Sequence, residues 1–351
     1  MEKTIDIGKA IVGKDKPAFI IAEMSANHNQ DFSIAVETVR AAKEVGANAI
    51  KLQTYTPDTI TIDCKNKYFQ INQGTLWDGK TLYELYQEAY TPWQWQPELK
   101  RIADDLGLIC FSSPFDKTAV DFLEEMDVPA YKVASFEITD IPLIRYIATK
   151  GKPVIISTGV ATLEDIEEAV ATCRDVGNEQ IILLKCTSSY PTLIEESNLK
   201  NIIDLANRFD VISGLSDHSL GITVPITAIA LGAKVIEKHF ILNKSLGGPD
   251  VAFSLDMTEF KKMVTAVREA EKALGNANYE LSEKTKKSRN FSRSLFAVKD
   301  ISAGELFTEE NIRSIRPGYG IAPKYLPDIL GKISKRDIKK GTPLNLNMID
   351  R

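Results

Sequence analysis

The sequence predicts a (β/α)8 barrel followed by a small β-rich domain, and two observations lead to that prediction. Residues 18–275 repeat one unit, in which a short apolar run precedes a stretch whose apolar residues recur at helical spacing. There are eight such runs, and about 250 residues is the usual size of one eight-stranded α/β barrel. An open, doubly wound sheet is the alternative, but eight even units favour a closed sheet.

The eight runs are β-branched and apolar on both faces, which is typical of buried parallel strands. They are Ala18–Ser25, Ala49–Tyr55, Leu108–Pro114, Ala130–Ser135, Pro153–Thr158, Gln180–Ser188, Val211–Asp217 and Val235–Leu242. The stretches between them have helix signals. Gly46 closes the first, Thr162 with Asp165 resembles a capping box, and an apolar stripe over 260–274 predicts the last helix.

One connection is far longer than its counterparts. Residues 56–91 follow the second strand and are rich in aromatic side chains, which argues against disorder. The stretch contains Trp77, Tyr83, Tyr86 and Tyr90, and Trp93 follows just beyond it. Connections longer than about 15 residues are usually functional. We therefore expect a lid over the site, with a plain structural insertion as the alternative.

The chain changes character after Gly275. Residues 276–293 are polar and charged, as in a linker, so the expected domains are 1–275, a linker over 276–293, and 294–351. The last segment repeats itself at an offset of 37 residues, with Lys299-Asp300-Ile301 matched by Arg336-Asp337-Ile338. A unit of 58 residues is marginal alone, so we expect it to dock on the barrel or on a partner subunit.

Composition excludes several classes of protein. Charged residues make up 26% and the net charge is −5, which argues against nucleic-acid binding. No apolar run approaches the roughly 20 residues of a membrane span, and the first residues lack the pattern of a signal peptide. Four scattered cysteines are typical of reduced thiols. We expect a cytoplasmic globular protein that binds neither nucleic acid nor membrane.

Polar side chains gather where each strand ends, which is where barrels carry function. Lys51 and Lys132 protrude from apolar runs, and hydroxyl groups accompany them on neighbouring strands. This combination suits a phosphate or carboxylate ligand. The alternative for each lysine is an ion pair with Glu23 or Glu137, and the two interpretations are compatible. Both carboxyl groups are also candidates for proton transfer.

Two of the three histidines, His218 and His239, end adjacent strands. Imidazole is a common ligand of divalent transition metals, so we expect a metal with open positions for water and substrate. The alternative is that both are buried core histidines whose hydrogen bonds are made within the protein. His28 lies in a loop, where a histidine is more often polar surface than part of a site.

These motifs, taken together, resemble the sialic acid synthase family, whose members condense phosphoenolpyruvate with an amino sugar. The stretches that carry the resemblance cover essentially the whole chain. They are residues 21–28 (IAEMSANH), 51–53 (KLQ), 113–115 (SPF), 129–132 (PAYK) with Ser135 and Glu137, 157–159 (STG), 214–218 (GLSDH), 237–240 (EKHF) and 248–250 (GPD). The tail resembles the family's antifreeze-like (SAF) domain through residues 316–321 (RPGYGI).

The resemblance implies roles for particular residues. His218 and His239 would hold a divalent metal, with Mn²⁺ as the first candidate and Mg²⁺ or Co²⁺ as others. Glu23 would activate water or stabilise the charge that develops at C2 of phosphoenolpyruvate. The residues implied for binding phosphoenolpyruvate are Lys51, Ser113, Lys132, Ser135, Ser157, Ser188 and Ser216. In the neuraminic members of the family, an Asn occupies the position of Ser188. Those implied for the sugar are Gln53, Glu137, Tyr190 and Asp250. Arg316 would reach the substrate from the partner subunit of a domain-swapped homodimer.

Within the family, the lid resembles that of the pseudaminic branch. The matching stretches are 74–83 (GTLWDGKTLY) and 90–93 (YTPW). That branch uses 2,4-diacetamido-2,4,6-trideoxy-β-L-altropyranose, and the apolar residues after Asp250 fit a 6-deoxy sugar. The alternatives are a neuraminate or legionaminate synthase and, more remotely, a metal-dependent sugar isomerase. A non-catalytic carbohydrate- or ice-binding protein is suggested only by the tail.

Overall fold

The computed structural model describes residues 3–13, 15–72 and 74–350. The chain divides into two compact units, Met1–Gly275 and Asn276–Arg351. Among the residues described, no helix combines the length and the apolar composition that crossing a membrane requires.

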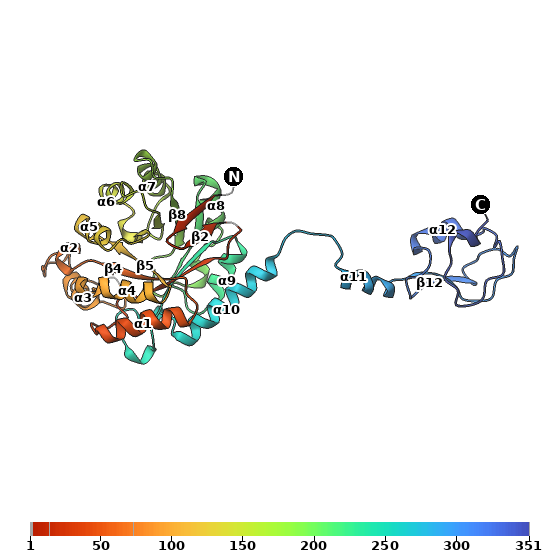
Figure 1. Ribbon diagram of the computed structural model, residues 1–351, viewed down its shortest axis with the longest axis horizontal. Helices are drawn as coiled ribbons and strands as arrows, with labels where there is room; N and C mark the ends of the chain where they lie inside the picture. Colours follow the sequence, from red (N-terminus) through yellow and green to blue (C-terminus); the bar gives the residue numbers. More distant parts are fainter. Residues whose placement is uncertain (1–2, 14, 73, 351) are drawn as a thin grey trace. The chain divides into compact units, whose positions relative to one another are not determined.

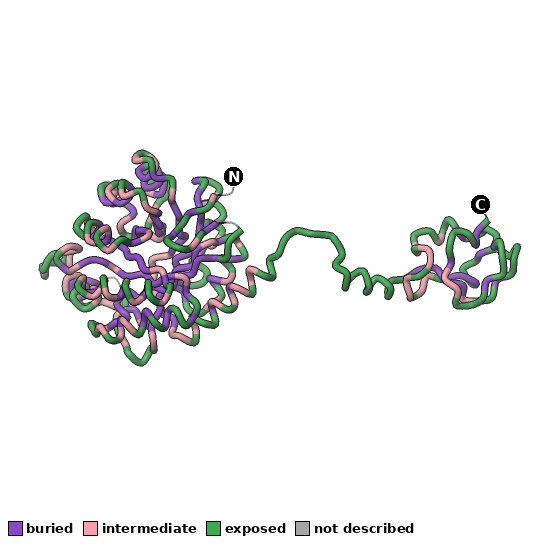
Figure 2. The backbone as a smooth tube through the Cα atoms, in the orientation of Figure 1, coloured by how far each residue is buried: buried purple, intermediate pink, exposed green. Residues whose placement is uncertain are grey.

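The larger unit is a closed barrel of eight parallel strands, as predicted (Figure 1). The strands are β3 (Phe19–Glu23), β4 (Ala49–Thr54), β5 (Ile109–Pro114), β6 (Tyr131–Val133), β7 (Val154–Ser157), β8 (Ile181–Cys186), β9 (Ile212–Asp217) and β10 (Val235–His239). Each lies inside one of the predicted apolar runs, and β10 pairs with β3 to close the barrel. The buried backbone in Figure 2 marks these strands at the centre of the unit.

Helices follow the strands and pack around them. They are α1 (Phe32–Glu44), α4 (Gln96–Asp105), α5 (Lys117–Glu125), α6 (Ile141–Ala148), α7 (Leu163–Asp175), α8 (Asn201–Phe209), α9 (Thr223–Ala230) and α10 (Met257–Leu274). The capping box predicted at Thr162 and Asp165 is present at the start of α7. Asp256 and Glu259 cap α10 in the same way, so sequence signals set both helix starts.

A short hairpin precedes the barrel, and the sequence analysis did not predict it. Strand β1 (Thr4–Ile7) pairs with β2 (Ala10–Gly13), and Ile5, Ile7 and Val12 are buried in one core cluster with Phe19. The turn residue Gly8 lies against Pro129 and Ile109, next to the starts of β6 and β5. The hairpin therefore covers the amino-terminal end of the barrel, opposite the strand ends that carry polar residues.

The long connection after β4 contains α2 (Pro57–Ile60) and α3 (Leu82–Ala89), followed by the short 3-10 helix η1 (Trp93–Trp95). Indole Nε1 of Trp77 donates to the carbonyl of Pro249, 3.1 Å away in the segment after β10. The ring of Trp77 also lies 5.6 Å from that of Tyr190. The insertion thus reaches over the end of the barrel, as expected of a lid.

The smaller unit contains α11 (Glu283–Ser288), β11 (Ser294–Ala297), β12 (Ile312–Ile315) and α12 (Leu326–Ile329). The segment predicted as a linker over 276–293 is exposed throughout but is partly helical, because it includes α11. The 37-residue repeat has a structural counterpart. Ile301 and Ile338, equivalent in the repeat, exchange two backbone hydrogen bonds of 2.8 Å.

The same symmetry extends to side chains. Asp300 accepts from the backbone of Lys340 and Asp337 accepts from the backbone of Ala303, each over 2.8 Å. Ten buried residues form this unit's own hydrophobic core, among them Phe307 and Leu344. The two halves therefore pack about a local pseudo-two-fold relationship that the sequence repeat had indicated.

Candidate active site

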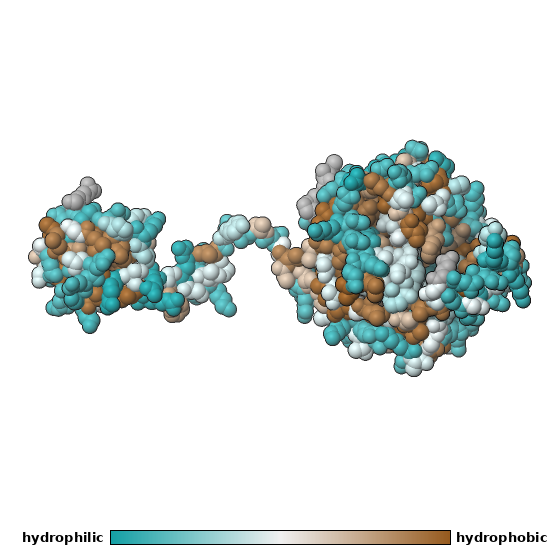
Figure 3. Space-filling view, turned by 180° about the vertical axis from the view of Figure 1, so that it is seen from behind, coloured by the Kyte–Doolittle hydropathy of each residue, from teal (hydrophilic) through white to brown (hydrophobic). Residues whose placement is uncertain are grey.

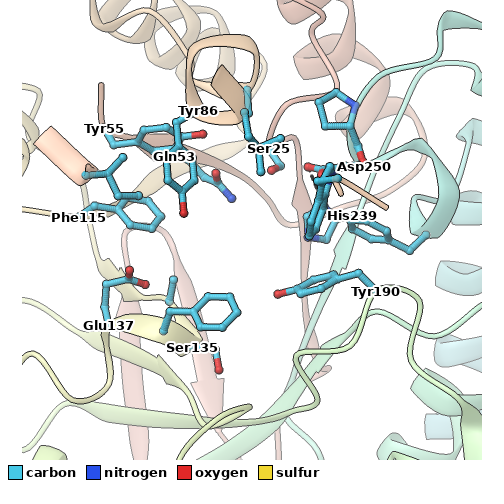
Figure 4. Close-up of a pocket in the computed structure, with 18 residues that line it drawn as sticks. Ser25, Gln53, Tyr55, Tyr86, Phe115, Ser135, Glu137, Tyr190, His239 and Asp250 are labelled. Carbon is cyan, nitrogen blue, oxygen red and sulfur yellow. Dashed lines mark hydrogen bonds and ion pairs between the residues drawn. The ribbon is translucent and has the colours of Figure 1, made fainter. Parts of the chain in front are cut away.

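A cavity of about 350 Å³ lies at the carboxyl ends of the barrel strands (Figure 4). Figure 4 shows Tyr55, Tyr86 and Phe115 on one side of this cavity, with His239 and Asp250 across it. Trp77 of the lid and Glu137 after β6 also line it. The cavity therefore combines an aromatic wall with ionisable groups, and it lies where a barrel of this class binds its substrate.

Four charged side chains lie buried on neighbouring strands near this cavity. Lys51 on β4 forms an ion pair with Glu23 on β3, and its Nζ is 3.7 Å from Glu237 Oε1 on β10. Lys132 on β6 lies 3.9 Å from the same Glu237 oxygen. These side chains are at most 7% exposed. Two ammonium and two carboxylate groups thus form a buried network, which we call the charged floor.

Burial and pairing shift the titration of these groups. Burial raises the pKa of Glu23 to about 7, even though Lys51 and a hydrogen bond from Ser25 act against the shift. Burial lowers the pKa of Lys132. For Glu237, burial acts to raise the pKa, but Lys132 and Lys51 outweigh it and hold that pKa below its usual value. Near neutral pH, Glu23 is therefore the carboxyl group of the floor that is poised to gain or lose a proton.

Hydroxyl groups extend the floor. Lys51 Nζ donates to Ser113 Oγ over 3.2 Å, and Lys132 Nζ donates to Ser157 Oγ over 2.6 Å. Ser216 Oγ donates to Glu237 Oε1 over 3.1 Å. Each of the predicted serines Ser113, Ser157 and Ser216 therefore touches a charged group, and the structure brings the predicted lysines and these hydroxyls together.

Two further predicted serines, from the segments after β6 and β8, also contact each other. Ser188 Oγ donates to Ser135 Oγ over 2.9 Å, and Ser135 Oγ accepts from the backbone of Val160 over 3.0 Å. A Cβ at Gly159 would lie 2.3 Å from Ser188 Oγ and 2.7 Å from Ser135 Oγ. A side chain here would displace both hydroxyls, so glycine allows the backbone after β7 to lie directly against them.

Glu137 stands apart from the floor. It follows β6 in the 3-10 helix η2 (Ser135–Glu137) and lines the cavity, and its Oε2 is buried without a hydrogen-bond partner among the described residues. Burial raises the pKa of Glu137 to about 7, although Lys132 acts in the opposite direction. An unpaired buried carboxyl oxygen in a cavity is costly unless a ligand supplies the missing partner.

The two predicted metal ligands lie side by side. The ring centroids of His218 and His239 are 5.3 Å apart. Nδ1 of His239 is buried without a hydrogen-bond partner, and burial lowers the pKa of His239 well below its usual value, which keeps the imidazole neutral. Nδ1 of His218 donates to the carbonyl of Thr187 over 3.0 Å, so its Nε2 carries the free lone pair.

The pair fits a divalent metal with open positions. The described part of the chain contains no group of three or more His, Cys, Asp or Glu residues placed to hold an ion. The chain itself would therefore supply the two imidazoles, His218 and His239, and the remaining positions would belong to water and substrate. The unpaired Nδ1 of His239 is the observation that supports this fit.

The residues predicted for the sugar line the same cavity. Gln53, Glu137, Tyr190 and Asp250 all lie on its wall. Asp250 Oδ2 is 3.7 Å from Nδ1 of His239, and the ring of Tyr190 is 5.1 Å from that of Phe253. These side chains come from β4 and from the segments after β6, β8 and β10, so the barrel closure brings them together.

The structure corrects three details. His28 is fully buried rather than on the surface, because its Nδ1 accepts from Gln30 N (3.1 Å) and its Nε2 donates to Thr91 (3.0 Å). Burial lowers the pKa of His28 to about 4. The carboxylate within ion-pair distance of Lys132 is Glu237, not Glu23 or Glu137. Glu237 was missed as a site residue, although its position two residues before His239 on one strand predicts the same face.

Arg316 belongs to the smaller unit and is exposed. Its neighbours are fixed, since Ser294 Oγ donates to the carbonyl of Pro317 over 2.7 Å and accepts from the backbone of Gly320 over 2.8 Å. No ion pair of Arg316 is found with the residues that the structure describes. The loop therefore presents a free guanidinium from a well-anchored backbone.

Comparison with known proteins identifies the family of the chain. The model of the NeuB family matches residues 38–279, and the model of the SAF domain matches residues 292–350. The chain is 50% identical to the pseudaminic acid synthase of Campylobacter jejuni, with 94% of this chain and 96% of that one aligned. It is 49% identical to the pseudaminic acid synthase of Helicobacter pylori, over 96% and 99% of the two chains.

A solved structure is similar as well. The N-acetylneuraminic acid synthetase of Leptospira borgpetersenii superposes with a TM-score of 0.73 at 32% identity, covering 82% of this chain and 95% of that one. The two family models together match residues in both the barrel and the tail. The chain therefore belongs to the NeuB family and ends in a SAF domain.

Proposed function

We propose that this protein condenses phosphoenolpyruvate with 2,4-diacetamido-2,4,6-trideoxy-β-L-altropyranose and water, giving pseudaminic acid and phosphate. The observation that carries the proposal is the charged floor with its hydroxyls, which offers a buried anion site directly beside a cavity large enough for a sugar. The choice of sugar is supported by relatives in C. jejuni and H. pylori that are named for this product.

The proposed reaction balances without a further reactant. The enol double bond of phosphoenolpyruvate supplies the electrons for a new bond from its C3 to the aldehyde carbon of the open-chain sugar. The oxygen of water adds to C2, and the bond between C2 and the phosphate oxygen breaks. One proton of the water ends on the hydroxyl group that forms from the aldehyde oxygen, and the other leaves with phosphate.

The chain's residues divide this work. Lys51 and Lys132, with Ser113 and Ser157, hold the phosphate and carboxylate of phosphoenolpyruvate by charge-assisted hydrogen bonds. Ser135, Ser188 and Ser216 complete that pocket. Glu23 moves the proton of the attacking water, because a carboxyl with a pKa of about 7 populates both protonation states at neutral pH.

In this proposal, the sugar occupies the cavity with the aromatic wall. Gln53, Tyr190 and Asp250 line it, and Glu137 supplies the hydrogen-bonding group that currently lacks a partner. Phe253 gives the apolar contact that a 6-deoxy sugar requires. The aromatic lid excludes water from the reacting carbons, which strengthens each electrostatic contact inside the cavity.

His218 and His239 would hold a divalent metal, with Mn²⁺ as the first candidate and Mg²⁺ or Co²⁺ as others. Such an ion acts as a Lewis acid that polarises an aldehyde oxygen. The two imidazoles are placed for it by β9 and β10, which are neighbours in the barrel. A cytoplasmic location is also part of the proposal, in keeping with four cysteines that are all free thiols.

The proposal includes a domain-swapped homodimer in which Arg316 completes the site of the partner subunit. Two observations support it. Large apolar side chains are exposed after four successive barrel strands, namely Phe136, Val160, Leu163, Leu193, Ile194 and Leu220. The smaller unit exposes its own, including Leu306, Tyr319, Ile333 and Leu346, and Figure 3 shows hydrophobic residues gathered on its visible face. Exposed apolar patches of this kind are typical of interaction surfaces.

The deciding experiment measures phosphate release from phosphoenolpyruvate and Mn²⁺ with either the 6-deoxy altrose sugar or N-acetylmannosamine. Release with the altrose sugar alone is the expected result. Release only with N-acetylmannosamine would assign the protein to the neuraminate synthases instead, and a legionaminate precursor should be run as a third acceptor. Sugar isomerisation without phosphate release would overturn the condensation itself.

A further inference from the structure

A buried ion pair lies on the outer side of the two strands that carry the histidines. Lys238 Nζ is 2.5 Å from Asp217 Oδ2, and the two side chains are 0% and 3% exposed. Lys238 and Asp217 are direct register partners on β10 and β9. Because side chains alternate along a strand, Lys238 points away from the face that Glu237 and His239 share. The pair therefore lies behind the site and does not belong to the charged floor.

The pair fastens the turn on which His218 sits. Asp217 uses its second oxygen, Oδ1, to accept from the backbone of Ser219 over 2.9 Å. Lys238 donates to the carbonyl of the same Ser219. The residues on both sides of His218 are thus tied to β10, the strand that ends in His239.

The remaining contacts of His218 complete this arrangement. Its backbone carbonyl accepts from Thr192 over 3.0 Å, and its Nδ1 donates to the carbonyl of Thr187 over 3.0 Å. Translation of the ring is limited by the backbone contacts, and rotation is limited by the ring hydrogen bond. Thr187 and Thr192 come from the segment after β8. Of the side-chain contacts described, those of the Lys238–Asp217 pair link the turn of His218 to the strand of His239, in addition to the backbone pairing of β9 with β10.

Stability alone is a weak reason for such a pair. Removing two charges from water costs about as much as their attraction returns, and well-packed apolar residues in their place are often neutral or stabilising. The carboxylate of Asp217, in contrast, satisfies Lys238 and Ser219 at once, which no apolar residue does. The arrangement is better explained by the position it imposes on the turn.

We propose that Lys238 and Asp217 are positioning residues that hold the ring of His218 at the separation from His239 at which both imidazoles bind one divalent metal. This inference rests on the proposed metal site and extends it to a pair of residues that touch neither metal nor substrate. Outer partners of this kind typically contribute about 10- to 100-fold in metal affinity.

The test compares Mn²⁺ affinity, read from the electron paramagnetic resonance signal of free Mn²⁺, with the melting temperature of the metal-free protein. Two variants are needed: Asp217→Asn, and the double variant Asp217→Leu with Lys238→Met. The expected result for the double variant is a melting temperature close to that of the unchanged protein, with Mn²⁺ affinity reduced by about 10- to 100-fold.

The variants separate positioning from stability. Asp217→Asn keeps the outline of the side chain but has a single oxygen for two partners, so it should fold and still lose Mn²⁺ affinity. If the double variant does not fold, the result for Asp217→Asn decides. Unchanged Mn²⁺ affinity in a folded Asp217→Asn or double variant would overturn the inference, whatever the effect on melting temperature.

Two controls complete the design. Lys244→Met with Glu259→Gln removes an exposed ion pair of 2.7 Å from the segment after β10, and it should leave Mn²⁺ affinity unchanged. His218→Ala should abolish Mn²⁺ binding. If the unchanged protein binds no Mn²⁺, the metal site and this inference fall together; if His218→Ala abolishes binding while the double variant binds normally, only this inference falls.

Discussion

Glu23 and Lys51 lie opposite each other in register on β3 and β4, and their side chains form an ion pair that is 1% and 4% exposed. Glu23 is also the register partner of His239 on its other side. One carboxyl group therefore stands between the lysine proposed for phosphoenolpyruvate and the imidazole proposed for the metal. Barrel pairing alone produces this adjacency, because the three residues come from segments distant in the chain.

Replacing Lys132 by Met should weaken phosphoenolpyruvate binding by about 100-fold, since removing one buried charged partner usually costs 2–5 kcal/mol. The barrel should remain folded, because Lys51 and Ser216 still contact Glu237. Isothermal titration calorimetry with phosphoenolpyruvate measures the loss directly.

The control for this variant is Lys152→Met. Lys152 pairs with Glu124 over 2.9 Å, away from the cavity, so its loss should leave affinity for phosphoenolpyruvate unchanged. Equal affinities in Lys132→Met and the unchanged protein would remove Lys132 from the proposed anion site.

Glu137→Gln should change how stability depends on pH. The pKa of Glu137 is raised to about 7 in the folded protein, so the folded state holds a proton that the unfolded chain releases above its ordinary value of 4.5. Stability from this group is therefore present below pH 4.5 and is lost as pH rises through 7. The variant has no proton to lose at this position. Between pH 5 and pH 8 its free energy of unfolding should therefore rise by about 2 kcal/mol relative to that of the unchanged protein.

Urea unfolding of both proteins at pH 5 and pH 8 measures this gain. The comparison uses the change with pH and not the absolute difference, because glutamine also buries an amide. Parallel stability curves for the two proteins across this range would show that Glu137 titrates normally.

Trp77→Ala should raise the KM for the sugar about tenfold, which corresponds to about 1.4 kcal/mol for the lost indole contacts. Trp77 lines the cavity, and its hydrogen bond and ring contact join the lid to Pro249 and Tyr190 rather than to the residues of the charged floor. The KM for phosphoenolpyruvate should therefore stay within twofold, a margin of roughly 0.4 kcal/mol.

Steady-state kinetics with each substrate varied in turn check this. Leu76→Ala serves as the control, because Leu76 is the preceding residue and is 53% exposed. A KM for the sugar that Trp77→Ala leaves unchanged would mean that the lid does not contact the acceptor.

Subunit mixing tests the proposed domain swap. Arg316→Ala and Glu23→Ala should each be inactive while folded. In a swapped heterodimer, one site pairs an intact barrel with an intact Arg316, so random exchange of equal amounts should restore about a quarter of the original activity.

If Arg316 serves the barrel of its own chain, every site in the mixture carries one defect and no activity returns. Size-exclusion chromatography of each variant before mixing shows whether both remain dimeric. A mixture that is dimeric and inactive would contradict the swap.

The barrel could be predicted because each strand can be recognised from its own short apolar run. Runs such as Ile181–Cys186 are apolar on both faces, and only a parallel sheet covered on both sides accepts many such runs. The two histidines proposed as metal ligands, His218 and His239, and the lysines could be located for the same reason, since strand ends converge in this fold. Which side chains these residues contact depends on the register between neighbouring strands, and the sequence of a single strand does not determine that register.

The missed features depend on contacts between distant segments. The β1–β2 hairpin has only four residues per strand, so its alternation is too short to stand out. His28 was expected on the surface because its loop is polar, but Thr91 and Trp95 bury it. Glu237 was overlooked as a site residue beside Lys238 and His239, and only the closed barrel brings it to Lys51 and Lys132.

The origin of the cavity walls has a consequence for protein engineering. The charged floor is built from barrel strands, whereas Ile60, Trp77, Leu85, Tyr86 and Ala89 come from one insertion between β4 and α4. The aromatic part of the wall and the charged floor are therefore encoded in separate stretches of the gene, whereas the polar residues proposed for the sugar lie outside the insertion. A library confined to residues 56–91, or the transplanted insertion of a relative, would sample new acceptor sugars on an unaltered catalytic scaffold.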